Sequence, residues 1–181
     1  MNPLVKYEYK SVSGTVDLDL VTSKDDLLDE ILKDSGIREE HDDAVKEFEF
    51  DPIDDDDLRE KAEGLITGYE DVPDKFDTPK SVDEELFEWL ALDEDEREMV
   101  FLYWNKNDSS ANIDEITDAY NGRYDSTAKF AESYCIETGL ISPGSQLCNH
   151  VDFDSYWEST LTHNYIEIET TKGDYLFFLN I

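Results

Sequence analysis

The aspartate-rich segment 51–57 (DPIDDDD) has the residue types that bind calcium. An EF-hand loop needs oxygen ligands at positions 1, 3 and 5, glycine at position 6 and glutamate at position 12. A loop starting at Asp51 has Ile53 at position 3 and Asp56 at position 6, and a loop starting at Asp93 has Arg97 at position 5. Neither segment fits. Two interpretations remain: a solvated helix start, and a charged face that binds a partner.

Cys135, Cys148, His150 and His163 are the side chains that could bind zinc or act as a nucleophilic pair. Their spacing matches no common zinc finger, and nothing marks an oxyanion hole or a third, orienting group. Cys135 is expected to be a buried small residue. With 47 acidic residues, carboxylate pairs occur at every spacing by chance and do not indicate a hydrolase. The sequence therefore predicts no enzyme, no cofactor and no metal.

Charge is the most unusual property of the chain. It has 47 Asp and Glu against 15 Lys and Arg, a net charge of −32, and residues 25–98 hold 31 of the acids but 8 of the bases. Duplex DNA carries one charge per about 1.7 Å, so 32 charges correspond to roughly 54 Å of duplex. An elongated protein with this charge could imitate DNA, and its natural partners would be basic, DNA-binding proteins.

The composition also bounds the class of protein. The 10 Tyr, 9 Phe and 3 Trp are spread through the acidic stretches, which indicates folded cores rather than a disordered acidic tail. No segment has the roughly 20 apolar residues of a membrane span, and no signal peptide is recognised. We expect a cytoplasmic protein that binds neither membranes nor nucleic acid directly.

The first 67 residues are expected to form an α/β domain with a three-stranded antiparallel sheet. Apolar and polar residues alternate at 5–9, 16–20 and 47–51, the last around Phe48 and Phe50, which predicts the three strands. Ser23 and Asp26 predict the start of a helix that ends at Ser35-Gly36. A second helix is expected after the four aspartates, with Leu58, Ala62, Leu65 and Ile66 on its apolar face.

Residues 68–125 are expected to form a helical middle domain. Pro73 and Pro79 mark 68–80 as a linker, and Ser81 and Glu84 predict a capping box before a helix. Further apolar stripes occur at 99–104 and 113–120, the second opened by Asn112 and Glu115.

Residues 126–181 are expected to form a C-terminal α+β domain. A helix starts near Ser126 and ends at Gly139, and strands at 165–170 and 175–179 form a closing hairpin. Together the three domains predict an elongated α+β fold. The three tryptophans, Trp89, Trp104 and Trp157, are interpreted as core residues, with interface anchors as the alternative.

The C-terminal third contains the segments 118–126 (DAYNGRYDS), 128–132 (AKFAE), 137–139 (ETG) and 151–156 (VDFDSY). With these segments it resembles the ArdA family of antirestriction proteins. These are similar to the family's Tyr-x-Gly-x-aromatic-x-Ser segment, the helix and Glu-x-Gly after it, and its Ile-Asp-Tyr/Trp segment before a hairpin. The N-terminal third departs from the family pattern, because the usual aromatic-Asn-Asn-Gly and the Gly-x-Trp tryptophan are missing. The family-motif residues are Tyr120, Gly122, Tyr124, Ser126 and Phe130.

This resemblance implies a DNA mimic, typically dimeric, that acts in the cytoplasm of a bacterial host and occupies the DNA groove of a type I restriction-modification enzyme. The sequence leaves four alternatives: that mimic, the same device against a CRISPR effector, nucleoid protein or repressor, a halophile's acidic protein, and an acidic-site hydrolase. Eleven lysines argue against salt adaptation. The carboxylates expected to bind the partner are Asp25, Asp26, Asp29, Glu30, Asp54, Asp55, Asp56, Asp57, Asp83, Glu84, Glu85, Glu88, Asp93, Glu94, Asp95 and Glu96.

Overall fold

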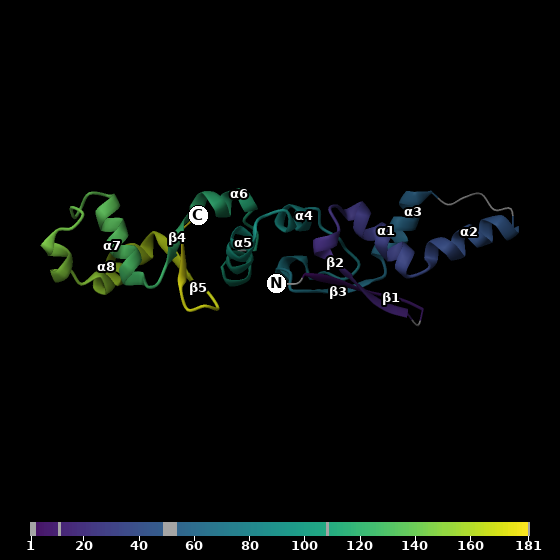
Figure 1. Cartoon of the computed structure of the whole chain (residues 1–181), viewed down its shortest axis with the longest axis horizontal. Helices are drawn as coiled ribbons and strands as arrows, with labels where there is room; N and C mark the ends of the chain where they lie inside the picture. Colours follow the sequence, from purple (N-terminus) through teal and green to yellow (C-terminus); the bar gives the residue numbers. More distant parts are fainter. Residues whose placement is uncertain (1–2, 11, 49–53, 108, 181) are drawn as a thin grey trace. The chain divides into compact units, whose positions relative to one another are not determined.

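The computed structural model describes residues 3–10, 12–48, 54–107 and 109–180 (Figure 1). The chain is a mixed α+β protein with two separate antiparallel sheets, as the sequence predicts. Its packing divides it into two compact units, unit 1 (Met1–Phe101) and unit 2 (Leu102–Ile181). The predicted boundary after residue 67 falls inside a strand of unit 1, and the boundary after 125 falls inside unit 2.

Unit 1 contains the sheet β2–β1–β3. Strands β1 (Leu4–Tyr9) and β2 (Val12–Asp17) form a hairpin, and β3 (Ile66–Glu70) pairs with the other edge of β1. Val5 and Tyr7 point into the core from β1. Gly14 lies opposite Tyr7, and a side chain at Gly14 would collide with the Tyr7 ring, so the close approach needs glycine there.

Three helices of unit 1 lie to one side of this sheet in Figure 1: α1 (Lys24–Asp34), α2 (Ile37–Phe48) and α3 (Asp55–Glu63). The predicted start of α1 is confirmed, because the Ser23 side chain accepts a hydrogen bond from the Asp26 amide. Helix α1 packs against both α2 and α3. Its buried stripe is the predicted one: Leu27, Leu28, Ile31 and Leu32.

Two of the predicted strands of unit 1 need correction. Leu18–Leu20 forms a short 3-10 helix, η1, so the strand ends at Asp17. The third strand is β3, not 47–51: Phe48 is the last residue of helix α2, and Phe50 lies outside the described residues. Ile66, expected on the helix, is the first residue of β3. The alternation near Phe48 was too short to separate a strand from a helix.

The proline-containing segment after β3 packs within unit 1 and is not a free linker. The 3-10 helix η2 (Asp74–Phe76) buries Phe76, and the amide of Lys80 donates a hydrogen bond to the Ile66 carbonyl at 3.0 Å. The Tyr69 hydroxyl donates to the Ser81 carbonyl at 2.6 Å. These contacts return the chain to β3.

Helices α4 (Glu85–Leu90) and α5 (Glu94–Lys106) follow. The predicted capping box of Ser81 and Glu84 is wrong, because the residue that caps α4 is Glu84, with no side-chain hydrogen bond. The predicted apolar stripe of α5 is confirmed by its buried side chains: Met99, Val100, Tyr103 and Trp104.

Unit 2 contains the sheet β4–β6–β5, made of β4 (Tyr120–Tyr124), β5 (Tyr165–Glu169) and β6 (Tyr175–Leu179). The predicted hairpin is β5–β6, paired from Tyr165–Leu179 to Glu169–Tyr175. Its other elements are the helices α6 (Ile113–Ala119), α7 (Thr127–Glu137) and α8 (Phe153–Thr160) and the 3-10 helices η3 (Gln146–His150) and η4 (Leu161–His163). The capping box of Asn112 and Glu115 is present as predicted.

An aromatic core holds unit 2 together. The Phe130 ring of α7 stacks on Phe177 of β6, with centroids 4.2 Å apart and an interplanar angle of 5°. Trp157 of α8 meets both rings edge-on, at 5.7 and 5.2 Å. This cluster joins α7, α8 and β6.

Candidate partner-binding surface

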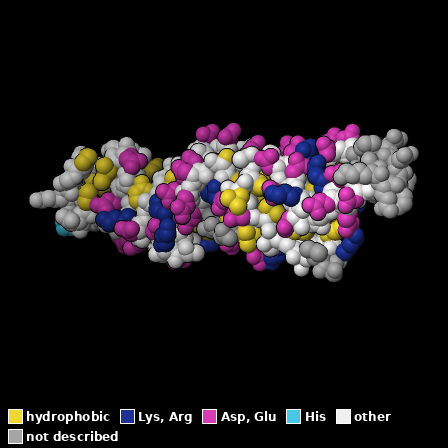
Figure 2. Space-filling view, turned by 45° about the vertical axis from the view of Figure 1, so that its right-hand side comes forward, with side chains coloured by type: hydrophobic (Ala, Val, Ile, Leu, Met, Phe, Trp, Pro, Cys, Tyr) yellow, Lys and Arg dark blue, Asp and Glu magenta, His cyan; other side chains and the backbone are white. Residues whose placement is uncertain are grey.

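The predicted acidic residues gather at the starts of four helices of unit 1. Helices α1, α3, α4 and α5 each carry acidic side chains in their first turn. The N-terminus of a helix has a partial positive charge that stabilises carboxylates placed there. The fold therefore accommodates the acids where the backbone favours them. Figure 2 shows Asp and Glu side chains spread across the visible face of the molecule.

Nearly all of the predicted partner-binding carboxylates are exposed. Only Asp29 and Glu85 are half-buried, and both are engaged in ion pairs. Lys75 holds Glu85 at 2.7 Å. The exposed members are Asp25, Asp26, Glu30, Asp54, Asp55, Asp56, Asp57, Asp83, Glu84, Glu88, Asp93, Glu94, Asp95 and Glu96.

Several of these exposed acids also have a structural role. Asp54 caps α3 by accepting from the Asp56 amide at 3.2 Å, and Asp93 accepts from the Glu96 amide at 2.9 Å. Asp83 accepts from the Glu85 amide at 3.0 Å. Such caps stabilise a helix by about 1 kcal/mol. The helix-start interpretation of the acidic runs is therefore correct for these residues, and it does not prevent their other oxygens from meeting a partner.

Asp26 faces back toward the residues before its helix. Its carboxylate accepts hydrogen bonds from the hydroxyl and, at 3.3 Å, from the amide of Thr22. The hydroxyl bond, and after it the amide bond, lowers the pKa of Asp26 from its ordinary value. The side chain therefore stays ionised, with its charge at the surface.

Two arginines bring together acids from two different helices. Arg59 of α3 binds Asp29 of α1 at two points, from Nε to Oδ1 and from Nη2 to Oδ2, each at 3.1 Å. Its Nη1 faces Asp25 at 3.4 Å and Asp56 at 3.7 Å. The hydrogen bonds from Arg59 lower the pKa of Asp29 and raise the pKa of Arg59.

Arg38 of α2 completes this network. Its Nη2 donates to Asp29 Oδ1 at 3.3 Å and its Nη1 lies 3.3 Å from Asp55 Oδ1. We call Arg38, Arg59, Asp25, Asp29, Asp55 and Asp56 the arginine network. The sequence reasoning missed both arginines. The signal was their rarity, because the chain has only 4 arginines and three of them, Arg38, Arg59 and Arg97, fall in the acidic stretch 25–98.

Other predicted acids have no ion pair or hydrogen bond from their side chains to any described residue. They project from the starts of α3, α4 and α5, and they are Asp57, Glu84, Glu88, Glu94, Asp95 and Glu96. Within the described part of the chain, they are the carboxylates most available to an outside cation.

The family-motif residues lie in unit 2, where they have structural roles. Tyr120 packs on Phe178 with centroids 5.5 Å apart, and Ser126 caps α7 by accepting from the Lys129 amide at 3.2 Å. Gly122 has φ +108°, a conformation that favours glycine, and a side chain there would press on the Tyr124 ring. The motif therefore shapes the turn from β4 into α7 rather than a site of chemistry.

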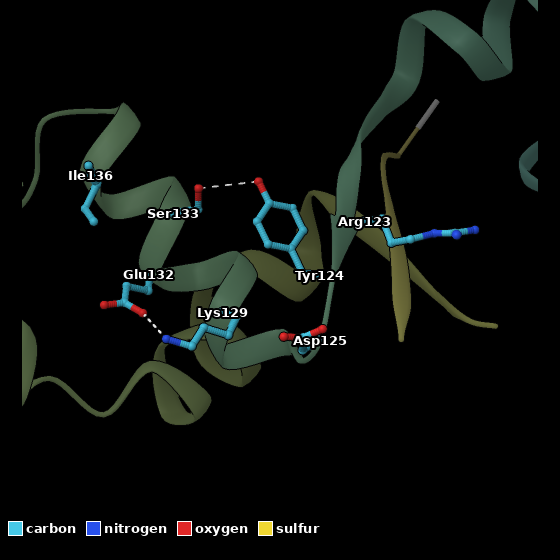
Figure 3. A pocket seen from close by; sticks show the side chains of 7 residues that line it. All are labelled: Arg123, Tyr124, Asp125, Lys129, Glu132, Ser133 and Ile136. Atoms are coloured by element: carbon cyan, nitrogen blue, oxygen red, sulfur yellow. Dashed lines mark hydrogen bonds and ion pairs between the residues drawn. The ribbon is translucent and has the colours of Figure 1, made fainter. Parts of the chain in front are cut away.

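A shallow groove of about 380 Å³ opens beside this turn (Figure 3). Tyr124 lies between β4 and α7, and its hydroxyl points toward Ser133 at 3.4 Å. Lys129 pairs with Glu132 at 2.8 Å, and Arg123 extends away from the other lining residues. Both cations of the groove are paired with acids of this chain, because Nε of Arg123 lies 3.6 Å from Oδ2 of Asp174.

The structure places both predicted cysteines in unit 2. Cys135 is buried in α7, where burial raises the pKa of its thiol, and Cys148 is half-buried in η3. The described residues contain no group of three or more His, Cys, Asp and Glu side chains that could hold a metal ion. The described helices likewise include none long and apolar enough to cross a membrane.

The tryptophans are core residues, as the sequence indicated. Trp89, Trp104 and Trp157 are all buried. The indole nitrogens of Trp89 and Trp104 donate to the carbonyls of Arg97 at 3.1 Å and Ala111 at 2.7 Å. They are therefore not interface anchors on this surface.

Comparisons with models of known protein families, with curated proteins and with solved structures found no match for this chain.

Proposed function

We propose that this protein is a non-catalytic DNA mimic that inhibits a DNA-binding defence enzyme of the type I restriction-modification class by occupying its DNA groove. The observation that carries the proposal is the set of exposed carboxylates at the starts of α3, α4 and α5 that have no cation of their own within the described residues. The net charge of residues 25–98 supports it, with 31 acids against 8 bases. The resemblance of residues 118–156 to ArdA proteins directs it toward restriction enzymes.

The mechanism is competitive and electrostatic. A groove built for DNA presents Lys and Arg side chains at the positions of phosphates, and carboxylates that reach these positions form charge-assisted hydrogen bonds with them. Many weak contacts then add up, so no single carboxylate is indispensable. The action needs no cofactor, nucleic acid or membrane, and it takes place in the cytoplasm of a bacterial host.

The same surface suits other proteins that bind nucleic acid, such as a CRISPR effector, a nucleoid protein or a repressor. The departure of the N-terminal third from the ArdA pattern supports this alternative. Identifying the captured target distinguishes a restriction enzyme from these other proteins.

A second copy of the chain is also proposed as a partner. Residues 138–151 contain no Asp, Glu, Lys or Arg, and within them Leu140 and Leu147 are each 63% exposed. Two copies of net charge −32 repel one another over most of their surfaces, so an uncharged segment is where they can meet. Light scattering should show a dimer, and the double variant Leu140→Asp, Leu147→Asp should be monomeric.

The direct test of the inhibitor function is capture of a target from a bacterial lysate by the tagged full-length protein. At about 50 mM salt it should recover a basic DNA-binding complex, and recovery should fall sharply at about 200 mM salt. Added duplex DNA should displace that complex, whereas an uncharged polymer at equal mass should not. A captured protein indifferent to both salt and DNA would contradict the mimic.

A further inference from the structure

The geometry of the arginine network is more specific than neutralising nearby acidic charge requires. Both oxygens of Asp29 are matched to nitrogens of Arg59, and the remaining Arg59 nitrogen reaches Asp25 and Asp56. Asp25 and Asp29 belong to α1, and Asp56 belongs to α3. One guanidinium therefore joins the first turns of two helices that carry predicted partner-binding acids.

Burial distinguishes this arginine from Lys33 of α1. The Arg59 side chain is 24% exposed, whereas the side chain of Lys33, which pairs with Glu30 on the same region, is 74% exposed. A planar guanidinium with five donors is suited to fixing several carboxylates at once, and lysine is not. Arg59 is therefore built into the packing of α1 against α3 and cannot move freely to meet the solvent.

Resting on the proposed function, we infer that Arg59, assisted by Arg38, is a positioning residue that sets the spacing of the carboxylates at the starts of α1 and α3. The positive charge of Arg59 is unfavourable for binding a basic groove. Its place within the acidic face is explained by the spacing that it imposes on the carboxylates. Without it, Asp25, Asp29 and Asp56 would repel one another and the two helix starts would separate. A mimic needs its charges at fixed distances, because preorganised charges bind without further ordering.

This inference makes a prediction whose sign differs from that of net charge alone. Arg59→Gln makes the protein more negative by one charge, so a purely coulombic view expects tighter binding to a basic groove. The positioning role expects weaker binding. Lys61→Gln is the matched control, because Lys61 is exposed on the same helix and its removal changes the net charge equally.

The test uses the full-length variants and a purified type I methyltransferase complex as the probe. Arg59→Gln should bind about tenfold more weakly than Lys61→Gln at the same salt. Arg59→Lys keeps the charge but loses the two-point geometry, and should fall between wild type and Arg59→Gln. Equal or tighter binding by Arg59→Gln than by Lys61→Gln would overturn the inference.

A target-independent measurement accompanies the binding. Carboxyl titration by NMR should show the pKa of Asp29 below its ordinary value in wild type and Lys61→Gln, and a return toward that value in Arg59→Gln. An unchanged Asp29 pKa in a folded Arg59→Gln variant would show that Arg59 does not hold Asp29. If Arg59 does hold Asp29 but wild type does not bind the methyltransferase, the proposed target is wrong, and the binding role of Arg59 is wrong with it.

Discussion

Arg97 and Asp19 form an ion pair in unit 1, with Nη1 of Arg97 2.8 Å from Oδ1 of Asp19. The pair joins the first turns of α5 to η1, at the end of the first hairpin. The same guanidinium lies 5.5 Å from the Trp89 ring and donates from Nη2 to the carbonyls of Leu90 and Leu92. One arginine thus anchors the connection between α4 and α5 to the N-terminal hairpin.

Arg97→Ala should therefore destabilise the protein strongly. The change removes the ion pair and leaves two carbonyls short of a donor, so we expect the free energy of unfolding to fall by about 2–4 kcal/mol. Urea denaturation followed by circular dichroism measures it. Lys33→Ala removes an exposed i,i+3 pair and should change the same quantity by only about 0.5 kcal/mol. Similar losses in both variants would argue against the anchor.

Phe130→Ala should destabilise unit 2. Phe130 is buried and stacks on Phe177, with Trp157 and Tyr165 against its edges. Truncation leaves a cavity in the centre of the aromatic core, for which about 3–5 kcal/mol is expected. Thermal or urea unfolding provides the measurement. Leu20→Ala serves as the control, because Leu20 is exposed and its loss creates no cavity. A Phe130 variant as stable as this control would be inconsistent with the core described.

Tyr7 should make stability depend on alkaline pH. Burial, and after it the hydrogen bond to Asp34, raises the pKa of Tyr7 to about 12. A tyrosine in the unfolded chain ionises at about pH 10, so above that pH the unfolded state loses its phenol proton first. The stabilisation is present below about pH 10 and is lost as the pH rises toward 12.

The comparison of wild type with Tyr7→Phe isolates this effect. Between about pH 9 and 11.5, the free energy of unfolding of wild type should fall by about 2 kcal/mol more than that of Tyr7→Phe. Tyr69, whose pKa is also raised by burial, is present in both proteins and cancels. Parallel pH profiles would show that the Tyr7 phenol has no special environment.

Neutralising the start of α3 tests the cumulative nature of the acidic surface. Asp55→Asn alone should weaken binding to the target only slightly, because an exposed ion pair is worth about 1 kcal/mol or less. Changing Asp54, Asp55, Asp56 and Asp57 together to Asn should weaken it far more, mainly by slowing association. Asparagine preserves the helix cap at position 54. Surface plasmon resonance at low and moderate salt gives both rates.

The charge-matched control removes four exposed acids from unit 2 instead: Asp125, Glu137, Asp154 and Glu158. If binding depended on net charge alone, both quadruple variants would lose the same affinity. A larger loss for the α3 variant supports a localised surface. Complete loss from Asp55→Asn alone, with the fold intact, would instead indicate a catalytic or metal-binding carboxylate.

The sequence predicted best the elements that carry their own local signals. The cap at Ser23, the capping box at Asn112 and the cap at Ser126 all fall where the pattern placed them. The β5–β6 hairpin also has local partners and was predicted nearly to the residue. In these cases the residues that determine an element lie within it or directly beside it.

Elements that depend on distant partners were missed. Strand β3 forms because β1, far away in the sequence, offers it an open edge. The capping box at Ser81 fails because tertiary contacts hold this segment: the Ser81 carbonyl accepts from Tyr69, and the Val82 amide donates to Glu63 at 2.8 Å. No local pattern contains these interactions.

The candidate surface was likewise predictable only in part. Exposure of the acids was predictable, because a charged run at a helix start faces water. Their pairing was not, because Arg59 meets Asp29 across 30 positions of sequence. Asp29 and Glu85 are half-buried because of how the helices pack, so no local pattern could distinguish them from the exposed acids.

Acidic residues at the first turns of helices have a consequence for how such a surface can change over generations. Exchanging Asp for Glu there, or adding or removing one acid, leaves the buried stripes of α3, α4 and α5 in place. The charge pattern can therefore drift, and be selected against a changing opponent, while the packing beneath it stays constant. Arg59 marks the limit of this freedom, since the acids that it holds cannot vary independently.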